Sequence, residues 1–251
     1  MATAWFRFYA ELNDFLPAAW RGRAFEVQFR PPLPVRHLIE RCGVPHTEVE
    51  IVLINGVSVS LEQPVADADR VSVYPMFETL DVTPLLRLRD RVLREPRFLA
   101  DAHLGRLAGY LRMLGFDTLY PVPGEDREVV DRALQEGRII LTRDRALLMH
   151  RRVPHGCYVR PTTPRLQLAY LLQRLDLCRL IRPFSRCIRC NGVLEPVAKA
   201  AVVAQLPPAV GATRQRFWRC RDCGRVYWRG SHYRRMRDFV QARCPGWDVP
   251  A

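Results

Sequence analysis

No stretch of this sequence approaches the roughly 20 consecutive apolar residues that a membrane-spanning helix requires. Residues 1–12 also lack the continuous apolar segment of a secretory signal peptide. From these two absences we expect a cytoplasmic protein without membrane association. Lysine is nearly missing as well, since Lys199 is the single lysine among 39 basic residues. An arginine preference can reflect genome composition and a solubilising surface, so residue type alone does not indicate a partner.

The basic charge is unevenly distributed along the 251 residues. Residues 1–80 carry 7 Arg and 10 acidic residues, a net charge of −3, and residues 81–180 carry 18 Arg and 12 acidic residues, or +6. Residues 181–251 carry 14 basic and 4 acidic residues, or +10. This asymmetry favours binding of a polyanion near the carboxy-terminal end, because each neutralised phosphate releases condensed counterions.

Four of the eight cysteines occur as two CxxC pairs, whereas Cys42, Cys157, Cys178 and Cys244 are single. Without a secretion signal, two such pairs indicate a zinc site far more often than disulfides. A redox-active CxxC is the alternative, but the double pairing counts against it. Four thiolates complete a tetrahedral site and leave no open position, so the zinc would be structural. The predicted zinc ligands are Cys187, Cys190, Cys220 and Cys223.

Residues 1–80 have the pattern of a small domain built on a β-sheet. Alternating apolar and polar residues predict strands, the first two joined as a hairpin, and the pair Asn55-Gly56 predicts a tight turn. The expected elements are strands at 4–9 and 25–29, a helix at 34–43, and strands at 51–54 and 71–75. This ββαββ order, with the stretches INGVSV and DADRVSVYP, resembles the ubiquitin-like β-grasp domains of the sulfur-carrier type.

Sulfur carriers end in a Gly-Gly whose carboxylate is activated, whereas this chain continues through residues 76–80. The resemblance therefore does not imply sulfur-carrier chemistry. It implies a module that binds a protein partner or positions RNA. A purely structural appendage explains the same pattern equally well.

Residues 81–95 predict a basic linker, and residues 96–181 alternate between strand and helix patterns. This alternation predicts an α/β domain with a parallel sheet. Its first helix has an apolar face formed by Leu104, Leu107, Ala108, Leu111 and Leu114, with Arg106 and Arg112 pointing elsewhere. A second helix begins at Asp126 and buries Val129, Val130, Ala133 and Leu134.

Two predicted apolar strands of this domain are each followed by an aspartate, Asp101 after the first and Asp144 after the later one. In open α/β sheets ligands bind beyond the carboxyl ends of the strands. Asp126 at a helix start and Asp117 at the second strand could join them. Carboxylates without histidine favour Mg²⁺ or Mn²⁺, ions that support phosphodiester hydrolysis. Taken singly, each aspartate is better explained as a helix cap or surface group, so it is their joint placement that indicates a site.

Residues 182–251 contain the CxxC pairs and short strand patterns at 193–197, 215–218 and 225–229, which together predict a zinc ribbon. Arginines interleaved with aromatic residues suit single-stranded or looped RNA, although some of the aromatic rings must form the ribbon's own core. The residues predicted to contact RNA are Arg216, Arg219, Arg221, Arg225, Trp228, Arg229, Arg234 and Arg235.

Four stretches of the sequence together are typical of one family. They are RFLADAHLGRLAGYLRMLGFDT, EGRIILTRDRALL, SRCIRCNG and CRDCGRVYWRGSHYRRM. They resemble the Mut-seven C-terminal (Mut7-C) RNase family, PIN-like nucleases followed by a zinc ribbon and in some members preceded by a ubiquitin-like domain. The resemblance places the acidic metal ligands at Asp101, Asp126 and Asp144. Many PIN-like relatives have a further acid soon after the last aspartate, but here Arg145 and Ala146 follow, which leaves Asp117 as the only helper for a second metal ion.

The sequence thus predicts an α/β protein with a PIN-like parallel-sheet nuclease core, an N-terminal β-grasp domain and a C-terminal zinc ribbon. The predicted activity is Mg²⁺- or Mn²⁺-dependent hydrolysis of RNA, leaving a 5′-phosphate and a 3′-hydroxyl. Arg143 and Arg145 would hold the scissile phosphate, although both are equally compatible with ordinary surface arginines. The alternative is a non-catalytic RNA-binding adaptor with a degenerate acidic site.

Overall fold

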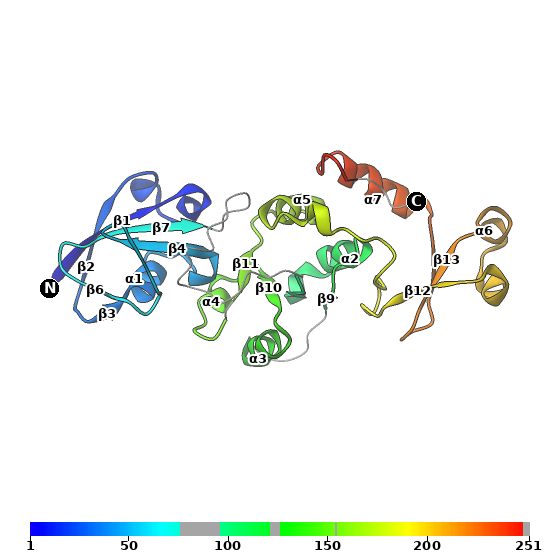
Figure 1. Ribbon diagram of the computed structural model, residues 1–251, viewed down its shortest axis with the longest axis horizontal. Helices are drawn as coiled ribbons and strands as arrows, with labels where there is room; N and C mark the ends of the chain where they lie inside the picture. The colour runs from blue at the N-terminus through cyan, green and yellow to red at the C-terminus, as the bar shows by residue number, and fades with distance from the viewer. Residues whose placement is uncertain (76–95, 121–125, 154, 248–251) are drawn as a thin grey trace. The chain divides into compact units, whose positions relative to one another are not determined.

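The computed structural model describes residues 1–75, 96–120, 126–153 and 155–247 (Figure 1). The chain divides into two compact units, the first formed by residues 1–95 and 124–158 and the second by residues 96–123 and 159–251. The predicted linker at 81–95 and the loop before Asp126 lie outside the described residues. The predicted domain boundaries stay a prediction.

The first unit begins with a five-stranded sheet in the order β2-β1-β7-β4-β5. Strand β1 alternates buried and exposed side chains, pairs antiparallel with β2 and parallel with β7, and packs with helix α1 into one apolar core. Its elements are β1 (Ala2–Phe8), β2 (Phe25–Phe29), α1 (Val35–Arg41), β4 (Val49–Ile54), β5 (Val57–Val59) and β7 (Arg70–Pro75). The predicted β-grasp order is therefore present.

Two details of this domain differ from the prediction. Strands β1 and β2 pair as expected, but their connection holds two 3₁₀ helices, η1 (Ala10–Phe15) and η2 (Ala18–Trp20). Pro34 precedes α1 instead of belonging to it, because strand β3 (Leu33–Pro34) pairs with β6 (Pro64–Val65). Such pairings join distant segments, so a local residue pattern does not reveal them.

The same unit contains a second group of elements, in which β10 and β11 pair in parallel. They are α3 (Asp126–Glu136), β10 (Ile139–Thr142), α4 (Arg145–Leu148) and β11 (Gly156–Tyr158). Helix α3 buries Val130 and Ala133 as predicted, but Val129 is only half-buried and Leu134 is exposed. The apolar face of α3 is thus narrower than the sequence indicates.

A short 3₁₀ helix of the β-grasp domain, η3 (His46–Glu48), packs on strand β11. Glu48 accepts a hydrogen bond from the backbone N–H of Tyr158 at 2.5 Å. The buried imidazole of His46 lies between the Glu40 carboxylate at 2.7 Å and the Val153 carbonyl at 2.9 Å. These contacts join the β-grasp domain to the edge of strand β11.

The second unit begins with strand β8 (Phe98–Ala100), which pairs in parallel with β9 (Thr118–Leu119). Between them lie η5 (Ala102–Leu104) and helix α2 (Gly105–Met113), whose predicted apolar residues are all buried. Arg112, which the sequence predicts to point away from this apolar face, is nevertheless buried, with only 4% of the residue exposed. Helices α5 (Pro164–Arg174) and η6 (Leu177–Leu180) follow, and α5 packs on α2.

The carboxy-terminal part of this unit is an antiparallel three-stranded sheet in the order β12-β13-β14. The strands are β12 (Leu194–Val197), β13 (Phe217–Cys220) and β14 (Val226–Trp228), close to the three predicted ones. Three short helices, η7 (Lys199–Ala201), η8 (Val203–Gln205) and α6 (Pro208–Thr213), fill the long connection between β12 and β13. Helix α7 (Ser231–Gln241) follows β14.

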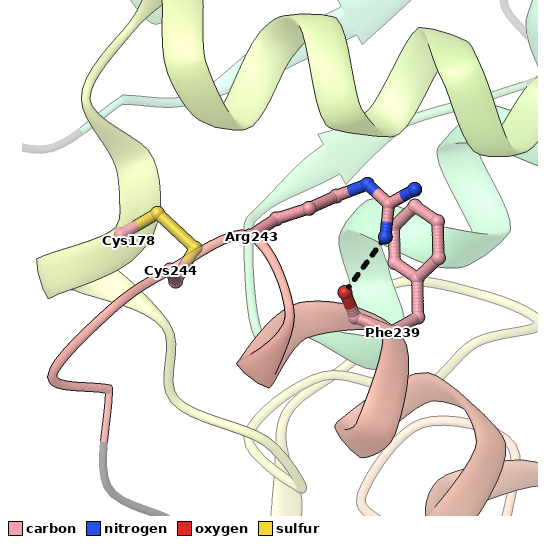
Figure 2. Close-up of a disulfide and its surroundings, with 4 residues drawn as sticks. All are labelled: Cys178, Phe239, Arg243 and Cys244. Carbon is pink, nitrogen blue, oxygen red and sulfur yellow. Dashed lines mark hydrogen bonds between the residues drawn. A yellow bond between two sulfur atoms is a disulfide. The ribbon is translucent and has the colours of Figure 1, made fainter.

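A disulfide between Cys178 and Cys244 fastens the end of α7 to η6 (Figure 2). The sequence shows both residues as single cysteines. Beside the bond, the guanidinium of Arg243 lies 3.8 Å from the centre of the Phe239 ring and donates a hydrogen bond to the Phe239 carbonyl. In the part of the chain that the structure describes, no helix is both long and apolar enough to cross a membrane.

Candidate functional site

Four cysteine thiols converge in the second unit. The sulfur atoms of Cys187, Cys190, Cys220 and Cys223 all lie within 4.8 Å of one another. The Cys187 and Cys223 sulfurs are 3.6 Å apart, and those of Cys190 and Cys220 are 3.5 Å apart. A tetrahedral site with zinc–sulfur bonds of about 2.3 Å has sulfurs about 3.8 Å apart. The cluster could therefore hold a zinc ion.

The two CxxC turns have the same local backbone geometry. The N–H of Asn191 donates to the Cys187 carbonyl at 2.9 Å, and the N–H of Gly224 donates to the Cys220 carbonyl at 3.1 Å. Asn191 and Gly224, each next to the second cysteine of its pair, have positive φ angles of 69° and 70°. Glycine and asparagine tolerate this conformation best. Local sequence thus forms each turn, and the fold brings the thiols of the two turns together.

The pKa values of Cys187 and Cys190 are shifted in opposite directions. Burial tends to raise the pKa of Cys187, but hydrogen bonds from the Tyr227 hydroxyl and from backbone N–H groups lower it to about 7. Burial and the neighbouring thiols raise the pKa of Cys190 to about 12. The four thiols therefore do not all ionise at neutral pH unaided. Zinc binding would release their protons and cancel the repulsion between the thiolates.

Arg112 joins the first CxxC turn to helix α2 and strand β9. Its guanidinium donates to the carbonyls of Ile188 at 3.1 Å and Arg189 at 2.9 Å, both within the turn. It also donates to the carbonyls of Thr118 at 2.8 Å and Tyr120 at 2.6 Å. Burial lowers the pKa of Arg112, and the Cys187 and Cys190 thiols and the Asp117 carboxylate oppose this effect.

Asp117 also takes part in the contact between the first CxxC turn and strand β9. Its carboxylate accepts a hydrogen bond from the Asn191 side-chain amide at 2.7 Å and pairs with Arg186 at 3.3 Å. The amide oxygen of Asn191 accepts the backbone N–H of Thr118 at 2.9 Å. The side chain predicted to help a second metal ion is thus engaged by the ribbon. Its catalytic role stays a prediction.

Asp101 and Asp144 occupy equivalent positions, each directly before a short helix and close behind a strand. Asp101 follows β8 and caps η5, with one carboxylate oxygen accepting the N–H of Ala102 at 2.5 Å. Asp144 follows β10 and caps α4, accepting the N–H of Ala146 at 2.7 Å. Each capping bond uses one carboxylate oxygen and fixes the direction of the side chain.

The predicted carboxylates are divided between the two units. Asp126, an exposed residue at the start of α3, and Asp144 belong to the first unit, and Asp101 and Asp117 belong to the second. Among the described residues, the four cysteines are the one cluster of three or more metal-ligating side chains. Convergence of the aspartates on one metal ion stays a prediction.

The sequence comparisons match two parts of the chain to known families. Residues 96–240 match the family model of the Mut7-C RNAse domain, and residues 1–81 match that of the Mut7-C ubiquitin domain. The chain belongs to the Mut7-C RNase family. No protein with a curated description matches it. The crystal structure of small archaeal modifier protein 1 from H. volcanii is similar, with 18% identity and a TM-score of 0.25, over 30% of this chain and 98% of that one.

In this Mut7-C protein, the two arginines beside Asp144 differ in their surroundings. The guanidinium of Arg145 lies 5.1 Å from the centre of the Phe15 ring and 5.5 Å from that of Tyr158. Such distances are typical of cation–π contacts. Arg143 is half-buried. Arg145 therefore links the ubiquitin-like domain to β11, a contact that sequence reasoning did not anticipate.

The arginines of the Mut7-C ribbon are mostly at its surface. Arg221 pairs with Glu195, and Arg229 lies over the Tyr233 ring at 5.7 Å. Trp228 and Arg229 are half-buried, and the exposed members of the predicted RNA-binding set are Arg216, Arg219, Arg221, Arg225, Arg234 and Arg235. The strongly basic surface that the charge count predicts is present, and contact with RNA stays a prediction.

Proposed function

We propose that this protein is a metal-dependent ribonuclease whose zinc ribbon binds the RNA. The match of residues 96–240 to the Mut7-C RNAse domain carries the proposal. The equivalent positions of Asp101 and Asp144, each behind a strand, support it. The ubiquitin-like domain would bind a protein partner, and zinc held by the four cysteines would be structural.

Asp101, Asp126 and Asp144 would hold the catalytic metal ion. Their donor set suits Mg²⁺ or Mn²⁺, because carboxylate oxygens without imidazole are the ligands that these ions prefer. When bound, such an ion supplies Lewis acidity, which lowers the pKa of a coordinated water and neutralises phosphate charge.

The chain's own residues would orient the reactants. The capping bonds hold the Asp101 and Asp144 carboxylates in fixed directions before substrate arrives. Arg143 and Arg145 flank Asp144 and would contact the scissile phosphate, and Arg145 also lies against two aromatic rings. Hydrolysis would leave a 5′-phosphate and a 3′-hydroxyl.

The test is the Asp144→Asn variant. Asparagine is as good a helix cap as aspartate, so α4 should remain folded while the charge that binds the metal is lost. Cleavage of single-stranded and structured RNA with Mg²⁺ or Mn²⁺ should fall on the order of 100-fold or more, the usual cost of removing one electrostatic group from an active site. Glu128→Gln removes an exposed charge from the first turn of α3 and should keep full activity.

The second candidate is an RNA-binding adaptor without catalysis. The presence of Arg145 and Ala146, where many PIN-like relatives have a further acid, favours it. If the wild-type protein and Asp144→Asn cleave RNA equally and both bind it, the adaptor hypothesis would be favoured over the nuclease hypothesis.

A further inference from the structure

A cavity of about 360 Å³ lies in the second unit, between the zinc ribbon and the first turn of α7. It is of the size of small-molecule binding sites, which begin at about 300 Å³. Its walls come from segments far apart in the sequence, namely the end of α2, the first CxxC turn, strand β14 and α7. The residues that the argument uses are Phe184, Arg186, Arg225, Tyr227, Trp228 and Tyr233.

Phe184, Tyr227, Trp228 and Tyr233 give the wall of this cavity four aromatic rings, and several of these rings are held in place. The Phe184 ring stacks on Trp218 with centres 4.2 Å apart, and it also contacts Tyr233 at 4.8 Å. The Tyr227 hydroxyl is held 3.0 Å from the Cys187 sulfur. A cavity with fixed aromatic walls suits a flat, aromatic ligand, because little side-chain freedom is lost on binding.

One polar group beside the cavity lacks a partner. Tyr233 is 9% exposed and lines the cavity, and its buried hydroxyl makes no hydrogen bond to any described residue. Buried hydroxyl groups without a partner are rare and costly. Burial also raises the pKa of Tyr233, so the hydroxyl stays protonated. Because the hydroxyl oxygen has almost no exposed area, a ligand in the cavity does not reach it, and Tyr233 contributes the rest of its side chain to the wall.

The charge around the cavity indicates an anionic ligand. Arg186 and Arg225 line it, and residues 181–251 carry a net charge of +10. Arg186 pairs with Asp117, whereas Arg225 is exposed and can contact a ligand. A flat aromatic ring attached to a phosphate is a nucleotide. Aromatic platforms beside arginines are how proteins bind unpaired bases.

We propose that this cavity binds one unpaired base of a single-stranded RNA. The base stacks on the aromatic wall, and Arg225 contacts the adjoining phosphate. This proposal rests on the RNA binding that the proposed function includes, but it does not require cleavage.

The experiment measures binding of fluorescein-labelled RNA octamers to the full-length Asp144→Asn protein, without chelator so that zinc stays bound. Octamers of each base are compared with an octamer whose central nucleotides are abasic, which keeps the phosphates. We expect the octamers with bases to bind about tenfold more tightly, within the range reported for stacking of one base. The fluorescence of Trp228 should be quenched on binding.

Trp228→Leu is the decisive variant, since it removes one aromatic side chain from the wall of the cavity. We expect it to remove most of the difference between the two octamers, to leave binding of the abasic octamer unchanged, and to keep the melting temperature within a few degrees of that of the parent. Trp5→Leu, on the exposed face of β1, is the control and should bind as the parent does.

Equal binding of the two octamers would overturn the proposal, because it would mean that only phosphates are recognised. A difference between the two octamers that persists in folded Trp228→Leu would overturn it as well. Base-dependent binding by a wild-type protein that cuts no RNA would leave this inference standing while the nuclease proposal fails.

Discussion

Arg112 shows how one side chain can determine the position of a whole module. Its guanidinium is buried and donates to four carbonyls, two on the chain around β9 and two in the first CxxC turn. The planar guanidinium presents several donors in a fixed arrangement that a lysine ammonium does not reproduce. The residue therefore acts as a structural link between helix α2 and the ribbon.

We predict that Arg112→Lys lowers the free energy of unfolding by about 2–4 kcal/mol, because several buried carbonyls lose a charged donor. Arg106→Lys, an exposed change on the same helix, should cost less than about 0.5 kcal/mol. Urea denaturation of the two variants beside the wild type measures the difference. Similar stability of the two variants would show that the Arg112 contacts contribute little.

At this scale the sequence predicts residues whose role is local. The four cysteines of the thiol cluster can be found from CxxC spacing, since each pair belongs to one short turn. Arg112 could not be recognised, because its partners in the CxxC turn lie 76 and 77 residues away. The contacts of Asp117 with Arg186 and Asn191 likewise join distant segments and exist only in the folded unit.

Helix α7 is the element whose position depends most on distant contacts. It buries Tyr233, Met236 and Val240, and the disulfide from Cys178 to Cys244 ties its end to η6 (Figure 2). The Phe239 ring lies near two guanidinium groups, those of Arg165 and Arg243. Because 66 residues separate the two cysteines, the bond closes a long loop and restricts the unfolded chain strongly.

We predict that replacing both cysteines with serine lowers the free energy of unfolding of the oxidised protein by at most about 4 kcal/mol, the loop-closure limit for a loop of this length. Amide hydrogen exchange should rise in α7 more than in α2. A reductant that does not bind zinc should have the same effect on the wild type and little effect on the variant. Equal exchange in oxidised and reduced wild type would contradict a fastening role.

Most helices and strands could be predicted from the sequence, because residue periodicity reports which face of each element is buried. The alternation in β1 and the apolar spacing of α2 are clear cases. Pairings between distant segments, such as β3 with β6 and Cys178 with Cys244, have no local pattern. The same limit applies to the carboxylates, since Asp101 and Asp144 can be placed at strand ends but their convergence cannot be deduced.

For the molecule as a whole, zinc is the ligand with the widest expected effect. The four thiols bring together both CxxC turns, and the first turn contacts α2 and β9 through Arg112 and Asn191. Loss of zinc should therefore loosen the nuclease core as well as the ribbon, because these buried partners would separate.

We predict that the purified protein contains about one zinc ion per chain. Removal by a strong chelator should lower the melting temperature and increase amide exchange in α2 and β9, and added zinc should restore both. Elemental analysis and calorimetry on the same samples make the comparison. A zinc-free protein with an unchanged melting temperature would show that the thiol cluster is not a structural metal site.

The contacts of Arg112 and Asp117 have a practical consequence for dissecting this enzyme. A protein truncated before Cys187 would expose a buried guanidinium and leave Asp117 without its Asn191 partner. Its inactivity would report a damaged core and say nothing about whether the ribbon takes part in catalysis. Point substitutions on the outer surface of the ribbon are the sounder way to separate substrate capture from hydrolysis.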